Sequence, residues 1–122
     1  MGKKTVIIGA TPNPARYAYF ACRMLLDYGH EVVPVGIKRG NVFGKEIQDL
    51  RLKPMIDNVD TVTMYIGTRH QHEWADYILS LKPARVIFNP GTENMELIQK
   101  LTDAGSEPVE GCTLVMLRSG QY

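Results

Sequence analysis

Short apolar runs alternate with amphipathic segments along the whole chain. Four of these runs predict buried strands, at Thr5–Ile8, Glu31–Val35, Thr61–Ile66 and Arg85–Phe88. A fifth, shorter strand is predicted at Pro108–Glu110. Strands that read as nearly continuous apolar runs are typical of a mostly parallel sheet that is covered on both faces.

The segments between these runs have helical periodicity. One helix is predicted from Pro14 to Tyr28, with Gly29 as its C-terminal cap, and another from Glu93 to Ala104, closed by Gly105. A third is predicted between Thr68 and Pro83. Thr68 and Gln71 have the spacing of a capping box at its start.

Two segments give weaker signals. Ile47–Ile56 predicts only a turn of helix, interrupted by Pro54, and Leu114–Leu117 fits either a strand or a helix. Alternating strands and helices predict an α/β protein with a Rossmann-like, doubly wound and mostly parallel sheet of five strands, in three α/β/α layers. The chain shows no linker or repeat, so residues 1–122 are expected to form a single domain.

The composition narrows the function. The 122 residues are 44% apolar and 22% charged, with a net charge of +1, so no general attraction to nucleic acid or to an acidic membrane is expected. No apolar stretch has the length of a signal peptide or membrane span, which makes the cytoplasm the expected location. Cys22 and Cys112 match no metal-binding spacing, and Cys22 is expected to be a buried thiol.

In a doubly wound sheet, ligands bind beyond the carboxyl ends of the strands. The first strand ends in Gly9-Ala10-Thr11-Pro12-Asn13-Pro14-Ala15-Arg16. Backbone N–H groups at the following helix start, the Thr11 hydroxyl and the Arg16 guanidinium suit a phosphate. The alternative is an ordinary strand-to-helix turn, because the full Gly-x-Gly-x-x-Gly pattern is missing.

The residues at the end of the second strand distinguish NAD from nucleotides that carry a phosphate on the ribose. A site for NAD usually has an acid here, to bind the ribose hydroxyls. This chain instead has Lys38 and Arg39. Two cations favour a ribose that carries its own phosphate, as in NADP and coenzyme A (CoA). A solvated basic loop with no ligand is the alternative interpretation.

The third and fourth strands also end in small residues. Gly67 and Thr68 follow the third strand, and Pro90, Gly91 and Thr92 come after the fourth. Because the carboxyl ends of parallel strands meet at one edge, these residues are expected to line the same crevice as Gly9 and Thr11.

These motifs resemble the CoA-binding domain family, small Rossmann-like proteins related to the N-terminal domain of the succinyl-CoA synthetase alpha subunit. The resemblance rests on Gly9-Ala10-Thr11-Pro12-Asn13-Pro14-Ala15-Arg16 and on Gly29-His30-Glu31-Val32-Val33-Pro34-Val35-Gly36-Ile37-Lys38, and extends over about residues 3 to 112. Two departures stand out. Gly36-Ile37 replaces the usual Asn-Pro, so the second loop is expected to take another course, and Phe88-Asn89-Pro90-Gly91 replaces Trp-x-Gln-x-Gly.

The resemblance implies roles for particular residues. It implies that the nucleotide end of CoA is bound by Gly9, Ala10, Thr11, Pro14, Arg16 and Lys38. It implies that the pantetheine path is lined by Gly67, Thr68, Pro90, Gly91 and Thr92.

No nucleophile elbow, paired carboxylates or metal-binding cluster is evident, and His70 and His72 point to different faces of their predicted helix. The sequence therefore favours non-catalytic binding of CoA or acyl-CoA, alone or with a partner enzyme subunit. One alternative is an NADP-dependent oxidoreductase-like protein. Another is an interaction module that has lost its nucleotide, with the apolar tail buried in a homodimer.

Overall fold

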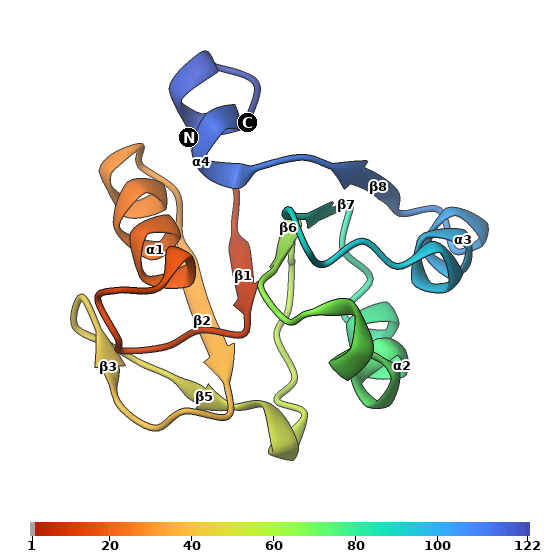
Figure 1. The fold of residues 1–122 in the computed structure, drawn as a ribbon, viewed down its shortest axis with the longest axis horizontal. Coiled ribbons are helices and arrows are strands. Elements are labelled where there is room, and N and C mark those ends of the chain that lie inside the picture. Colours follow the sequence, from red (N-terminus) through yellow and green to blue (C-terminus); the bar gives the residue numbers. More distant parts are fainter. Residues whose placement is uncertain (1) are drawn as a thin grey trace.

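The computed structural model describes residues 2–122. Its centre is a six-stranded parallel sheet with the strand order β5-β2-β1-β6-β7-β8 (Figure 1). The strands are β1 (Thr5–Ile8), β2 (Val32–Gly36), β5 (Gln48–Asp49), β6 (Thr61–Met64), β7 (Arg85–Phe88) and β8 (Glu107–Glu110). The chain runs outward from β1 in both directions, so the Rossmann-like, doubly wound fold is confirmed, with six strands where five were predicted.

Helices cover both faces of this sheet. They are α1 (Tyr17–Asp27), α2 (Ala75–Ser80), α3 (Met95–Asp103) and α4 (Thr113–Ser119). Figure 1 shows α1 and α4 together on one side of the sheet and α2 and α3 on the other. A two-stranded hairpin, β3 (Asn41–Val42) with β4 (Lys45–Glu46), flanks α1. The predicted three-layer architecture is therefore present.

The alternation of side chains along β1 builds two cores. Ile7 packs with Leu25 of α1 and Leu117 of α4. Val6 and Ile8 point the other way, into the larger core that contains Ile78 and Leu97. Successive side chains of a strand point to opposite faces, so a short apolar run supplies both cores at once.

The sixth strand lies in a segment for which only a helical turn was predicted. Within Ile47–Ile56 the chain forms β5, which pairs with β2, and then the short 3-10 helix η1 (Leu50–Leu52). Gln48 and Asp49 join the sheet through their backbone alone and have no apolar pattern. The predicted turn of helix is therefore present as η1, and β5 before it was not predicted.

The predicted capping box does not form. Two short 3-10 helices, η2 (Thr68–His70) and η3 (His72–Trp74), precede α2, and Gly67 is the N-cap of η2. The Thr68 hydroxyl donates to the backbone carbonyl of Glu93. Gln71 is fully buried and donates to backbone carbonyls of Ile66 and Thr92. Both side chains therefore connect separate loops and do not cap a helix.

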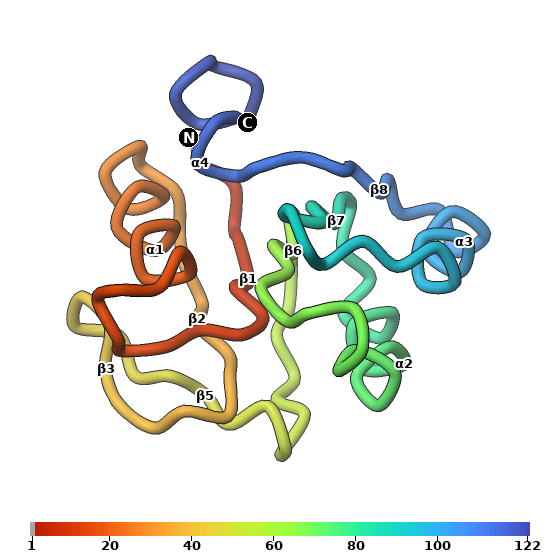
Figure 2. The backbone as a smooth tube through the Cα atoms, in the orientation of Figure 1, coloured from red at the N-terminus to blue at the C-terminus, as the bar shows by residue number. Residues whose placement is uncertain are grey.

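The apolar tail forms α4, on which Thr113 and Leu117 are buried. The chain then turns back, and Tyr122 reaches the amino edge of the sheet beside Lys3. Figure 2 follows this path from the red first strand to the blue end. Packing of the tail on its own chain accounts for Thr113 and Leu117, and burial of the tail in a homodimer stays a prediction.

Two residues, Cys22 and His30, lie in environments set by the fold. Cys22 is buried, as predicted. His30 is half-buried, because its Nδ1 accepts from the Lys3 N–H and its ring lies 4.8 Å from that of Tyr122. No helix among residues 2–122 is long and apolar enough to cross a membrane. Over the same residues, no group of three metal-ligating side chains occurs.

Candidate functional site

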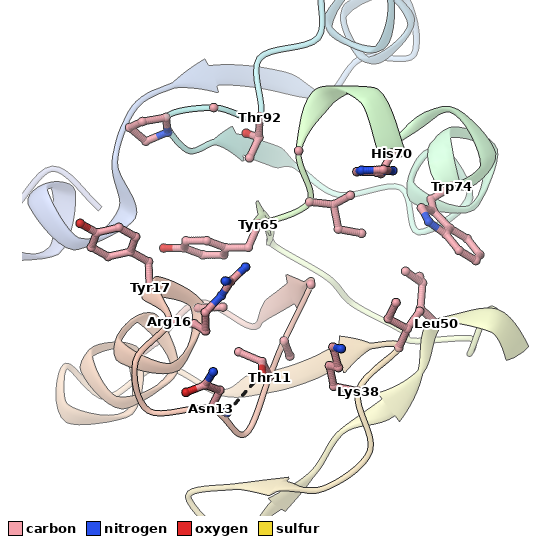
Figure 3. A pocket seen from close by; sticks show the side chains of 18 of the residues that line it. Thr11, Asn13, Arg16, Tyr17, Lys38, Leu50, Tyr65, His70, Trp74 and Thr92 are labelled. Atoms are coloured by element: carbon pink, nitrogen blue, oxygen red, sulfur yellow. Dashed lines mark hydrogen bonds between the residues drawn. The ribbon is translucent and has the colours of Figure 1, made fainter.

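The loops that follow β1, β2, β6 and β7 line one cavity of about 830 Å³ at the carboxyl edge of the sheet (Figure 3). Nine of the residues singled out from the sequence line it: Gly9, Ala10, Thr11, Arg16, Lys38, Gly67, Pro90, Gly91 and Thr92. Pro14 and Thr68 are not among the lining residues. The cavity opens where the strand order reverses, which is the usual ligand position in this type of sheet.

The first turn of the loop after β1 is held by the sheet. The N–H groups of Gly9 and Ala10 donate to the Val35 carbonyl, at 2.9 and 3.0 Å. Gly9 has a φ of +100°, and a Cβ there would lie 2.9 Å from the carbonyl carbon of Tyr65. Glycine is therefore needed for the chain path at this position, and these two N–H groups are not free to meet a phosphate.

The rest of this loop delays the start of the helix. Thr11 Oγ1 accepts from the Asn13 N–H at 3.2 Å, and Asn13 Oδ1 accepts from the Ala15 N–H at 3.0 Å. Such side-chain turns compete with helical geometry. As a result α1 begins at Tyr17, three residues later than predicted.

The start of α1 is suited to an anion. Its N-cap, Arg16, makes no side-chain cap, and its first turn has no acidic residue. Within residues 2–122, the N–H groups of Thr11, Tyr17 and Ala18 have no acceptor. All three residues line the cavity. Unpaired N–H groups and the positive end of a helix dipole attract negative charge.

The last residue of β2, Gly36, lies directly against the loop after β1. A Cβ at Gly36 would lie 2.5 Å from the Ala10 carbonyl oxygen. This contact explains why Gly36 stands where the family usually has Asn, because any side chain would displace the loop above it.

Lys38 and Arg39 follow on the loop after β2, and both are exposed. Neither makes a salt bridge within the described chain. Lys38 lines the main cavity, and Arg39 lines a neighbouring hollow of about 600 Å³. The nearby acid, Asp49, is bonded by the guanidinium and backbone N–H of Arg51, which lower the pKa of its carboxyl. The loop therefore presents positive charge.

Neutral side chains make up much of the rest of the cavity. Figure 3 shows Leu50 and Trp74 at the end near Lys38, and Tyr17 and Tyr65 at the other end. Half-exposed Ile37 also lines it. The two exposed ionisable residues on the far wall are His70 and Glu73. These aromatic residues were not predicted as site residues, because aromatic positions in strands and helices are typical of the core.

A buried polar network centred on Asn89 lies next in sequence to the lining residues Tyr65 and Pro90. Asn89 Nδ2 donates to Thr63 Oγ1 and to the Met64 carbonyl, both at 2.7 Å, and its Oδ1 accepts from the Thr113 N–H at 2.9 Å. These bonds join β6, β7 and α4. Burial raises the pKa of the neighbouring Tyr65, so its phenol remains protonated across the physiological range. The network is thus polar and uncharged.

Comparison with known proteins identifies the family. Residues 3–118 match the family described as CoA binding domain. The chain belongs to this CoA binding domain family. The match covers both the loops that carried the resemblance and the tail beyond residue 112. A search of curated proteins gives no match.

Solved structures share the CoA binding domain fold of this chain. A crystal structure of an uncharacterized protein has 56% identity and a TM-score of 0.96, over 100% of this chain and 99% of that chain. A hypothetical protein from Pyrococcus horikoshii OT3 has 25% identity and a TM-score of 0.84, over 97% and 83%. A Thermus thermophilus protein has 24% identity and a TM-score of 0.86, over 99% and 91%, and shows the fold alone.

Proposed function

We propose that this CoA binding domain protein binds CoA or acyl-CoA in the cavity at the carboxyl edge of its sheet. One observation carries the proposal, which is the uneven distribution of charge in the cavity. The unpaired cations Arg16 and Lys38 lie on the loops after β1 and β2, whereas the loops after β6 and β7 line the cavity with glycine, proline and threonine at the strand ends, and the ionisable His70 and Glu73 lie farther along the chain, in η2 and η3. CoA has the same asymmetry, with a polyanionic nucleotide at one end and a neutral pantetheine arm at the other.

The nucleotide half fits the β1 and β2 side. The diphosphate would be bound by the Arg16 guanidinium and by the unpaired N–H groups of Thr11, Tyr17 and Ala18. Lys38 would bind the phosphate on the ribose, because a charged hydrogen bond to phosphate is a strong one. The adenine ring would pack against Ile37 and Leu50, which line the same end.

The pantetheine half fits the β6 and β7 side. A Cβ added at Gly67 or Gly91 would meet no atom within 4 Å, so the backbone at both positions is open to the cavity. The Gly91 N–H is bonded to Glu93 and the Gly67 carbonyl to the His70 N–H, but the Gly67 N–H and the Gly91 carbonyl have no partner among residues 2–122. These two groups can bond to the amides of pantetheine, and its methylene groups can lie against Tyr65 and Pro90. No charge is needed along this path.

In this proposal the protein binds the thioester carrier and performs no reaction on it. It would hold CoA for a partner enzyme subunit or respond to the level of acyl-CoA. The proposed role therefore places any chemistry on the thiol in another protein.

Calorimetric titration with CoA, dephospho-CoA, NADP and NAD tests the proposed function. CoA is expected to bind more tightly than dephospho-CoA by about 1–3 kcal/mol, the scale of a charged hydrogen bond to the missing phosphate. Binding of NADP without CoA would replace the proposal with the oxidoreductase alternative. Absence of binding by all four would favour an interaction module. Mass spectrometry of gently purified protein gives an independent result if CoA is retained.

A further inference from the structure

Gln71 lies behind the cavity wall and uses its whole side chain to join two loops. It follows η2 and is fully buried. Its Nε2 donates to the Ile66 carbonyl at 2.8 Å and to the Thr92 carbonyl at 2.7 Å. Its Oε1 accepts from Asn94 Nδ2 at 3.1 Å. The two donor bonds also fix which end of the amide is the nitrogen.

The two loops joined in this way are the ones that follow β6 and β7. Ile66 lines the cavity directly before Gly67, and Thr92 lines it directly after Gly91. Further bonds run between or within the same loops. The Thr68 hydroxyl donates to the Glu93 carbonyl, and the Gly91 N–H donates to Glu93 Oε1 at 2.9 Å. Among the side chains that make these bonds between the loops, Gln71 is the fully buried one.

Gln71 has no role as a helix cap or as an apolar core residue. A buried amide is favourable only when its donors and acceptor are all bonded. Replacement by an apolar side chain of similar length would leave two carbonyls and the Asn94 amide without partners. Buried polar groups left unpaired are costly, so the two loops would move apart or admit water.

We infer that Gln71 is a positioning residue for the pantetheine half of the ligand. This inference rests on the proposed function. Gln71 sets the spacing between Gly67 and Gly91, the two open backbone positions along the path of the arm. It makes no bond to the loops after β1 and β2, so the nucleotide half is independent of it. Gln71 thus controls one half of the site only.

Comparing CoA with adenosine 3′,5′-diphosphate, which lacks the pantetheine arm and the 5′ phosphate that joins it to the nucleotide, tests this separation. The test variant is Gln71→Met, and the matched control is Gln99→Met, on the exposed face of α3. Gln71→Met is expected to weaken CoA binding by about tenfold or more, the effect of unpairing buried polar groups. The affinity of this variant for adenosine 3′,5′-diphosphate should stay within about twofold of wild type. Gln99→Met should change neither.

Hydrogen exchange without ligand provides a second measurement. Gln71→Met is expected to speed exchange at the amides of both joined loops together, and at no others near the cavity. If this variant does not fold, Asn94→Asp is the substitute. Its carboxylate still caps α3 by accepting from the Leu97 N–H, but it can no longer donate to Gln71.

The outcomes separate the two proposals. Wild-type protein that binds CoA, with Gln71→Met unchanged or weakened equally for both ligands, overturns the positioning role and leaves the proposed function intact. Wild-type protein that binds neither CoA nor the diphosphate overturns the proposed function and this inference with it. Selective loss of CoA affinity, with faster exchange confined to the two loops, supports the inference.

Discussion

The two edges of the sheet use their cations in opposite ways. At the carboxyl edge, Arg16 and Lys38 are exposed and form no ion pair among residues 2–122. At the amino edge, Lys3 Nζ and Arg85 Nη1 both donate to the Tyr122 carbonyl. The Arg85 guanidinium also lies 4.5 Å from the centre of the Tyr122 ring.

This difference separates a binding role from a structural one. A cation in water keeps its charge available to a ligand at little cost. A partly buried cation must be matched by carbonyls or an aromatic face, and these interactions then stabilise the fold. In the composition the four cations of the two edges are equivalent. Only their partners in the structure distinguish the binding role from the structural one. The comparison predicts that changes at one edge affect stability and changes at the other affect binding.

The largest expected effect is on stability at the amino edge. Tyr122→Ala removes the ring that Arg85 and His30 contact, and should lower the free energy of unfolding by about 3 kcal/mol. Chemical denaturation measures this loss. The control is Tyr28→Ala, because Tyr28 is 50% exposed and should change stability by less than about 0.5 kcal/mol. Similar losses for both variants would contradict a structural role for the amino edge.

The next largest effect is on binding at the carboxyl edge. Arg16→Ala and Lys38→Ala should each weaken CoA binding by about 1–3 kcal/mol, because each removes a charged hydrogen bond to a phosphate. Calorimetry measures the affinity, and thermal unfolding without ligand should show no change. Arg23→Ala, at an exposed α1 position outside the cavity, is the control. Unchanged affinity in both test variants would remove their assigned roles.

A single hydroxyl pair tests the amino edge more finely. Thr5 Oγ1 and the Tyr122 hydroxyl form a hydrogen bond, and Thr5 is fully buried. Thr5→Val removes this bond and the bond from the Thr5 hydroxyl to the Lys3 carbonyl, and should cost about 1–2 kcal/mol of stability, the usual net value of two hydrogen bonds. A double-mutant cycle with Tyr122→Phe isolates the pair. A coupling energy near zero would show that the two hydroxyls contribute independently.

The smallest effect is the pH dependence from His30. Its pKa is lowered from the ordinary 6.5, first by burial and then by the charges of Lys3 and Arg85, with Asp60 acting in the opposite direction. The unfolded chain therefore binds the proton more readily, so stability falls as the pH drops below about 6.5. Denaturation midpoints for wild type and His30→Gln, measured at several pH values, check this slope. An equal slope in the variant would assign it to other groups.

Much of the fold could be predicted from the hydrophobic pattern within single segments. The strands β1, β2, β6 and β7 are short apolar runs, and burial on two faces leaves few other uses for such a run. Elements that depend on distant partners were not predicted. β5 is polar and exists because its backbone pairs with β2, and Gln71 has the spacing of a cap but finds better partners in two other loops.

The site divides in the same way. Glycines and threonines at strand ends could be predicted, because parallel strands bring their carboxyl ends to one edge. Tyr65 and Trp74 could not, since an aromatic residue in an apolar pattern is typical of the core. Asn89 was noted as a departure from the family pattern, but its bonds to β6 and α4 require the three-dimensional structure.

Gly36 makes the width of the cavity adjustable by a single methyl group. The Ala10 carbonyl rests on this residue with no space between them, so an alanine there would act as a wedge beneath the loop that carries the helix start. The unpaired N–H groups at that helix start would be displaced without any change in charge. A substitution at Gly36 would in this way change the shape of the cavity while every residue that lines it stays the same.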